Sequence, residues 1–192
     1  DIRVVGLHLK TLWSELRDRR LHINDLSAVR VDVAVRTPPA AAPASSAPFR
    51  MPALPLSLRV DRLSLGGLGL TVDGEKPPVD LLSLSTALTL DARTATVMLD
   101  ELRVAHDDTL LSFNGNLALR GLAQPWPFEL NLHGSAQDRS AHSPVCFRRI
   151  SQGPEAVSQP CRVDLDLRLA GTPDAFHLRA NAQGQGLTLK AD

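Results

Sequence analysis

The chain lacks several features that would point directly to a function. It contains no tyrosine, and aromatic residues make up 4% of its 192 residues. Lys plus Arg and Asp plus Glu number 21 each, so the formal net charge is zero and a basic nucleic-acid-binding surface is not expected. No apolar run approaches the roughly 18 residues that suggest a transmembrane helix, and no charged segment precedes an apolar core as in a signal peptide.

Catalytic motifs are also absent from the sequence. Asp164 and Asp166 share one strand face, as a glycosidase pair would, but Arg162 and Arg168 flank them and favour a charged outer face. The His106-Asp107-Asp108 segment is interpreted as a solvated turn, because no nucleophile motif accompanies it. His22 is expected on the polar surface of its strand. We therefore predict that the chain is not an enzyme and binds no cofactor or metal ion.

Cysteine is scarce: the chain has only Cys146 and Cys161, fifteen positions apart. Two cysteines that flank one irregular loop predict a local disulfide in an oxidising compartment, the alternative being two free thiols. Closing a loop of this size would contribute roughly 3 kcal/mol in the chain-entropy model. A metal site is not expected, because neither cysteine lies in a CxxC motif.

The feature that is abundant is period-two alternation of apolar and polar residues. It is clearest in the segment 113–136, FNGNLALRGLAQPWPFELNLHGSA, which we interpret as a hairpin of two strands broken by a Gly- and Pro-containing turn. The apolar positions of its two arms are Leu117, Leu119, Phe128, Leu130 and Leu132. Strands with the same alternation are expected along most of the chain.

The pattern divides the chain into three segments. Residues 1–36 form an N-terminal β unit with one or two helical turns near 11–19, and 37–55 is a Pro/Ala-rich linker or loop. Residues 56–192 form a repetitive sheet, interrupted at 137–161 by an inserted loop that the disulfide would hold. Two sites are predicted to be irregular: a turn or bulge at Asn24-Asp25, and a bulge near Asp61-Arg62, where the alternation changes phase.

No long amphipathic helix is available to cover the apolar side of such a sheet. Two arrangements remain: the sheet folds onto itself as a sandwich, or it curls around a foreign apolar molecule. We predict the second, an all-β protein with an elongated, curled (taco-like or U-shaped), mostly antiparallel β-sheet and an apolar concave groove. Because the sequence opens inside a strand-like pattern, we also expect it to be a piece of a longer protein.

Four stretches of the sequence follow a pattern known from another group of proteins: 6–35 (GLHLKTLWSELRDRRLHINDLSAVRVDVAV), 56–70 (LSLRVDRLSLGGLGL), LSFNGNLALRGLAQPWPFELNLHGSA and LDLRLAGTPDAFHLRANAQG. In this order they resemble the N-terminal part of the TamB family, the inner-membrane subunits of the translocation and assembly module. The last two are similar to a repeat that the family shares with AsmA-like proteins. The insertion between Cys146 and Cys161 has no counterpart in that pattern.

The resemblance implies a periplasmic protein anchored in the inner membrane by a helix that is absent here. It implies a TamA-like barrel protein in the outer membrane as partner, with transport of phospholipid between the membranes, assembly of outer-membrane proteins, or both. Acyl chains would then lie on the alternating apolar residues. The candidate lipid-groove residues are Leu56, Leu58, Leu68, Leu70, Leu82, Leu84, Leu88, Leu90, Phe113, Leu117, Leu119, Phe128, Leu130, Leu132, Val163, Leu165, Leu167 and Leu169.

Three other interpretations of the same pattern stay open. The apolar residues could form the dry core of a sandwich. The chain could be a chaperone or scaffold that binds unfolded outer-membrane strands at its sheet edge by β-augmentation. A β-solenoid carbohydrate enzyme is disfavoured, because it would need clustered acidic residues and an aromatic platform for the sugar.

Overall fold

The computed structural model describes residues 1–36, 56–75, 79–138, 161–184 and 187–191. In this part of the chain, the only helix is a short 3-10 helix, η1 (Trp13–Asp18), which confirms the helical turns predicted near 11–19. The rest is largely β-strand, in agreement with the predicted all-β class. The strands are β1 (Ile2–Val5), β2 (His8–Leu12), β3 (Arg20–Ala28), β4 (Arg30–Val35), β5 (Ser57–Leu65), β6 (Leu68–Val72), β7 (Val79–Leu90), β8 (Ala95–His106), β9 (Thr109–Leu119), β10 (Phe128–Asp138), β11 (Cys161–Thr172), β12 (Ala175–Gly184) and β13 (Leu187–Ala191).

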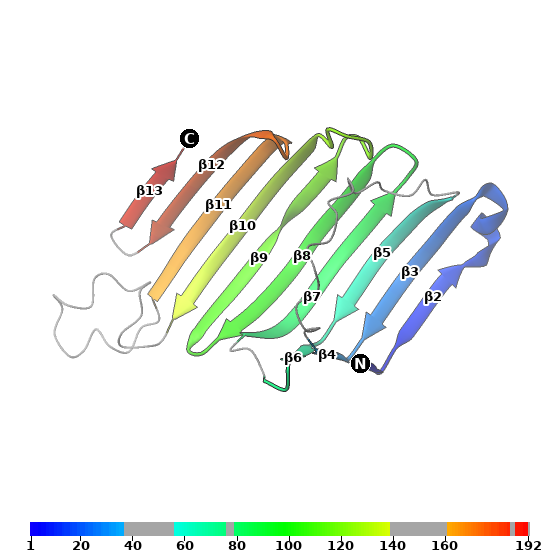
Figure 1. Ribbon diagram of the computed structural model, residues 1–192, viewed down its shortest axis with the longest axis horizontal. Helices are drawn as coiled ribbons and strands as arrows, with labels where there is room; N and C mark the ends of the chain where they lie inside the picture. Colours follow the sequence, from blue (N-terminus) through cyan, green and yellow to red (C-terminus); the bar gives the residue numbers. More distant parts are fainter. Residues whose placement is uncertain (37–55, 76–78, 139–160, 185–186, 192) are drawn as a thin grey trace, which may run out of the picture.

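All thirteen strands belong to one sheet that is not closed into a barrel (Figure 1). From β7 to β13 each strand pairs antiparallel with the next strand along the chain. Among the described strands, only β3 with β5 and β4 with β6 pair in parallel. The mostly antiparallel sheet is therefore confirmed, whereas its curled outline stays a prediction. The strands of residues 1–36 join the same sheet as those that follow residue 56.

The sheet divides in two at β7. Over Leu84–Leu90, β7 pairs with β5, and beyond β5 the sheet continues through β3 to β2. At Leu81, the same edge of β7 pairs with Leu68 of β6, which leads through β4 to β1. We call the strands β1, β4 and β6 the side branch. In Figure 1 β4 and β6 lie near the end of the sheet opposite to the connection between β2 and β3.

The side branch exists because three consecutive strand pairs turn at one corner. The chain passes from β1 to β2 at Gly6, from β3 to β4 at Val29, and from β5 to β6 at Gly66-Gly67. A Cβ on Gly6, whose φ is 66°, would lie 2.6 Å from Val29 Cγ2, and a Cβ on Gly66 would lie 2.6 Å from the Val29 carbonyl oxygen. The corner therefore requires glycine on both sides of Val29, because a larger residue would collide with the Val29 side chain at position 6 and with the Val29 backbone at position 66.

The irregular positions predicted from the sequence are confirmed. In β3 the partner of Lys10 is Asp25 and the partner of Thr11 is Ile23, so Asn24 is an extra residue, as in a β-bulge. In β5 the register shifts between Val60 and Leu63, at the predicted phase change. The hairpin of β9 and β10 also matches the prediction for 113–136.

The turn of that hairpin is held by the residue between its two prolines. The Trp126 backbone has φ of 51°, and its N–H donates to the Ala123 carbonyl at 3.0 Å. Its indole Nε1–H donates to the Leu122 carbonyl at 3.1 Å. The side chain thus closes its own turn.

The predicted linker at 37–55 lies outside the described residues, as does most of the predicted insertion at 137–161. Only its ends are described, because β10 extends to Asp138 and β11 begins at Cys161. Cys161 is disulfide-bonded, in agreement with the predicted disulfide, and Cys146, the other cysteine of the chain, is outside the described residues. Asp138, directly opposite Cys161, is buried and accepts a hydrogen bond from Thr109 Oγ1 at 2.8 Å.

Candidate functional site

The strand registers place the apolar residues of successive strands opposite one another. One row across the sheet reads Leu88, Val97, Leu117, Leu130, Leu169 and Leu178. Because directly paired residues of neighbouring strands point to the same side of a sheet, such rows build one continuous surface. We call this surface the apolar face; it continues on β5 and β3 through pairs such as Val60 with Ile23.

Most of the predicted groove residues lie on the apolar face. Those in its register are Leu58, Leu84, Leu88, Leu90, Phe113, Leu117, Leu119, Phe128, Leu130, Leu132, Val163, Leu165, Leu167 and Leu169. Leu68 lies opposite Leu81, whose other partner is Val104, so Leu68 and Leu70 carry the same face onto the side branch. Leu82 falls at a register shift and is 42% exposed, and Leu56 precedes β5.

Several members of the apolar face were not among the predicted groove residues. They are Leu21, Ile23, Leu26, Val60, Leu63, Leu65, Leu81, Leu99, Leu102, Val104 and Leu111. Many lie next to a bulge, where the alternation changes phase: Leu99 and Leu102 are three residues apart but pair with Gly115 and Phe113, which are two apart. Each bulge thus returns the apolar residues to the same side of the sheet. The sequence shows this as a change in the phase of the apolar–polar alternation within one strand.

No second layer of described strands covers the apolar face. In β11 the apolar Val163, Leu165, Leu167 and Leu169 are half-buried, and the alternating charged residues are exposed. The only buried hydrophobic residues in the described ranges are Val60 and Cys161, at 4% and 2% exposed. A dry sandwich core would bury many more, so the described residues form an open apolar sheet face.

Two positions in the middle of the apolar face are occupied by glycine. Gly134 lies opposite Phe113, and a Cβ there would be 2.6 Å from ring atom Cδ1, so the aromatic ring occupies the space above the glycine. Gly115, with φ of 157°, lies opposite Leu132, and a Cβ there would collide with the Asn131 carbonyl oxygen. The Phe113 ring therefore occupies the space at Gly134, and the β10 backbone occupies the space at Gly115.

The opposite face of the sheet is polar and its charges are paired locally. Arg162 contacts Asp164 at 2.8 Å, and His133 hydrogen-bonds Asp166. Asp164 and Asp166, considered above as a glycosidase pair, thus have different partners: Arg162 pairs with Asp164 and His133 with Asp166.

A third charge pair lies where the hairpin turn meets this polar face. Arg120 Nη2 donates to Glu129 Oε2 at 2.5 Å, and the hydrogen bond lowers the pKa of the Glu129 carboxyl. Both side chains are exposed, so the pair contributes little to stability.

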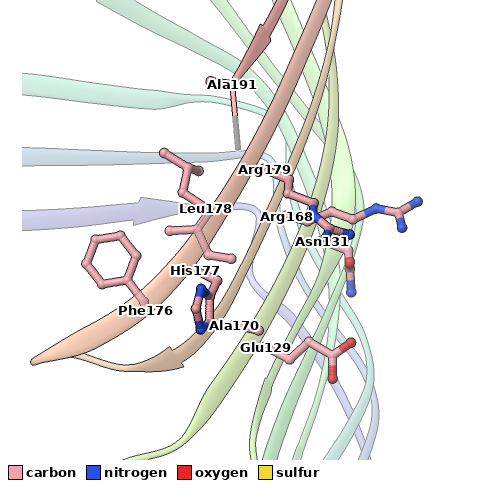
Figure 2. Close-up of a pocket in the computed structure, with 10 residues that line it drawn as sticks. Glu129, Asn131, Arg168, Ala170, Phe176, His177, Leu178, Arg179 and Ala191 are labelled. Atoms are coloured by element: carbon pink, nitrogen blue, oxygen red, sulfur yellow. The ribbon is translucent and has the colours of Figure 1, made fainter.

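A hollow of about 760 Å³ lies beside β12 (Figure 2). It borders both faces of the sheet. Figure 2 shows Phe176 and Leu178 on one side of β12, and Arg168, Arg179 and Asn131 on the other. Over Ala175–Arg179, the edge of β12 that faces away from β11 has no partner strand among the described residues, because β13 pairs only with Ala180–Gly184.

In the described ranges, no three His, Cys, Asp or Glu side chains are arranged to hold a metal ion. No helix there has the length and apolar character needed to cross a membrane. Comparisons of the chain with protein-family models, with curated proteins and with solved structures find no match.

Proposed function

We propose that this chain is a periplasmic part of a TamB-like protein and that its apolar face carries the acyl chains of phospholipids between the inner and outer membranes. The observation that supports the proposal is the open apolar face itself, continuous in register from β3 to β12. An apolar sheet face that no second layer of described strands covers is typical of a binding surface for an apolar partner.

The dimensions of the face suit an acyl chain. The strands β7 and β8 have 12 residues each, which at about 3.3 Å per residue is roughly 40 Å. One leaflet of a bilayer's hydrocarbon core is about 15 Å thick, so a whole acyl chain fits along a strand. Each CH₂ removed from water contributes about 0.8 kcal/mol, so a chain of about 16 carbons gains on the order of 10 kcal/mol before ordering costs.

The uniformity of the face favours movement over tight binding. Its rows repeat Leu and Val from strand to strand, so an acyl chain finds similar contacts at each step across the sheet. Gly134 and Gly115 add no side chain of their own to the middle of the face. A single deep pocket would instead hold its ligand in one place.

The location and the partners follow from the resemblance and from one structural fact. A disulfide at Cys161 supports an oxidising compartment such as the periplasm. We propose that the full-length protein is anchored in the inner membrane by a further helix, reaches a TamA-like barrel protein, and also supports outer-membrane protein assembly. No nucleic acid, cofactor or catalytic residue has a role in this proposal.

The test is native mass spectrometry of the 192-residue chain, with solvent extraction of bound molecules. Leu130 on the apolar face and its neighbour Asn131 on the polar face form a matched pair of positions. We expect phospholipid to co-purify with the wild type and with Asn131→Asp, and to be lost from Leu130→Asp. Circular dichroism checks that both variants keep the sheet. A lipid-free wild type, or equal lipid content in the two folded variants, would refute the proposal.

A second candidate function rests on a different observation, the open strand edges. The outer edges of β2 and of β12 over Ala175–Arg179 have no partner strand among the described residues. An unfolded outer-membrane strand could add to such an edge by β-augmentation. Crosslinks from β12 edge positions to a nascent barrel protein, with no lipid bound to the chain, would favour this chaperone function over lipid transport.

A further inference from the structure

The exposed large apolar side chains of the described residues are concentrated near the N-terminus. Ten of the seventeen lie between Ile2 and Val35, although this segment is a minority of the described chain. Three of them lie close together in sequence on and beside η1: Leu12, Trp13 and Leu16, at 38%, 68% and 39% exposed. We call residues Lys10–Arg20 the η1 tip; it joins β2 to β3 at one end of the sheet (Figure 1).

The charges exposed on the η1 tip are mainly positive. Lys10, Arg17, Arg19 and Arg20 are all exposed, and none of them has an ion-pair partner in the described part of the chain. Asp18 is the one exposed acidic residue of the tip. Exposed cations thus outnumber exposed anions four to one within eleven residues of a chain that has no net charge overall.

The other acidic residue of the tip is held on the sheet side. Glu15 Oε1 is 2.9 Å from His22 Nδ1, and the second ring nitrogen, Nε2, is 2.8 Å from Asp61 Oδ2. The His22 side chain is only 11% exposed, so this histidine lies between η1 and the sheet and not on the open surface that the sequence suggested. The contact positions η1 against β3 and β5 and leaves the cations outward.

We infer that the η1 tip docks on the surface of an anionic phospholipid bilayer. Tryptophan is favoured at membrane interfaces because its ring is apolar and its N–H is polar, and Trp13 has the highest exposure of the three apolar residues. Arginine and lysine beside inserted apolar side chains contact lipid phosphates while their stems stay in the apolar layer. The tip combines both features on one exposed turn.

The small size of the tip favours a membrane over a protein partner. A stable protein interface buries roughly 800 Å² on each partner, which three apolar side chains do not supply. A bilayer surface requires only a few inserted side chains and nearby cations, since lipids rearrange around them. This docking surface is separate from the apolar face proposed to carry lipid, so either can fail without the other.

The chain offers an unusually clean reporter, because it has two tryptophans and no tyrosine. In the variant Trp126→Phe, Trp13 is the only tryptophan that fluoresces. In Trp13→Phe, the only one is Trp126, which is half-buried in its own turn. Each variant is mixed with vesicles of phosphatidylcholine alone, or with vesicles that also contain about 30% of the anionic lipid phosphatidylglycerol, which attracts basic segments. We expect a blue shift of Trp13 with the anionic vesicles only, and no shift of Trp126.

Vesicle sedimentation then tests the cations. Removing one cation costs about 1 kcal/mol of anionic-membrane binding, or about five-fold in affinity, so Arg17→Gln with Arg20→Gln should weaken binding about 25-fold. The matched control, Arg162→Gln with Arg168→Gln on β11, removes the same charge far from the tip and should leave binding unchanged. Salt should weaken wild-type binding, because exposed charges are screened.

Specific results would overturn the inference. These are equal binding to neutral and anionic vesicles, a shift of Trp126 equal to that of Trp13, or equal losses from the two arginine pairs. A tip that binds an acidic protein but no vesicle would also overturn it. Leu130→Asp, which should abolish lipid carriage on the apolar face, should leave vesicle docking intact and thus separates the two proposals.

Discussion

The corner around Val29 makes a sharp prediction about two adjacent glycines. Gly66 and Gly67 both lie between β5 and β6, yet only Gly66 is pressed against another strand. A Cβ at Gly66 would lie 2.6 Å from the Val29 carbonyl oxygen, whereas a Cβ at Gly67 would meet nothing closer than the Leu81 carbonyl at 3.7 Å. Alanine should therefore be tolerated at one position and not at the other.

The size of the effect follows from these distances. Ordinary contacts of a Cβ begin near 3.4 Å, so Gly66→Ala must move the Val29 backbone by several tenths of an ångström. The Gly66 N–H also donates to the Ala28 carbonyl at 3.0 Å, so the shift disturbs a hydrogen bond of the corner. Overpacking of this kind costs about 1–3 kcal/mol. Gly67→Ala should change stability by less than about 1 kcal/mol, and in the stabilising direction if its backbone suits alanine.

The assay is thermal and urea unfolding followed by circular dichroism. For a chain of this length, about 2 kcal/mol corresponds to a fall in Tm of roughly 4–8 °C for Gly66→Ala, with Gly67→Ala near the wild type. Equal effects of the two substitutions would refute the close approach of β5–β6 to Val29. A separate early transition in the unfolding curve of Gly66→Ala, absent from that of Gly67→Ala, would show that the side branch unfolds independently of the rest of the sheet.

Three further predictions concern other parts of the sheet. The pKa of His22 is raised above 6.5, first by its hydrogen bond to Glu15 and then by that to Asp61, so its stabilising effect is complete below pH 6.5 and is lost as pH rises through the folded-state pKa. The pKa of Asp61 is lowered from 3.8 by its hydrogen bonds to Arg59 and then to His22, so its stabilising effect is complete above pH 3.8 and is lost as pH falls through the folded-state pKa. A plot of Tm against pH should therefore fall at both ends, and in His22→Gln the fall at higher pH should be missing. Reducing the disulfide of Cys161 should cost roughly 3 kcal/mol, measured by urea unfolding with and without a reductant; no change would mean that the loop closure is unimportant. Val60→Ala, at the most buried aliphatic position described, should cost about 1.6 kcal/mol for two methyl groups plus a cavity term, and a neutral result in the same assay would contradict its burial.

Local patterns in the sequence were sufficient to predict the strands and their irregularities. The alternation of Leu117 and Leu119 against Phe128, Leu130 and Leu132 predicted the β9–β10 hairpin, because period two reports which side chains share a face. The phase change after Val60 predicted a bulge, because a strand can change phase only by gaining a residue. Both signals are contained in a few neighbouring residues.

The same patterns predicted much of the apolar face but not its full membership. Once a bulge shifts the register, residues such as Leu99 and Leu102 share a face although their spacing suggests otherwise. His22 was expected on the open surface, but its two carboxylate partners come from η1 and from β5, which are separated from it in sequence. A contact with a distant partner leaves no periodic signal around the residue itself.

The sequence by itself determined that this protein is a set of amphipathic strands, because alternation is a local property of the chain. Only the tertiary structure decided that β3 pairs in parallel with β5, that β7 pairs with both β5 and β6, and that a corner forms at Val29. The physical reason is that backbone hydrogen bonds between strands carry no residue identity, so alternation fixes which side of a strand is apolar but not which strand lies beside it.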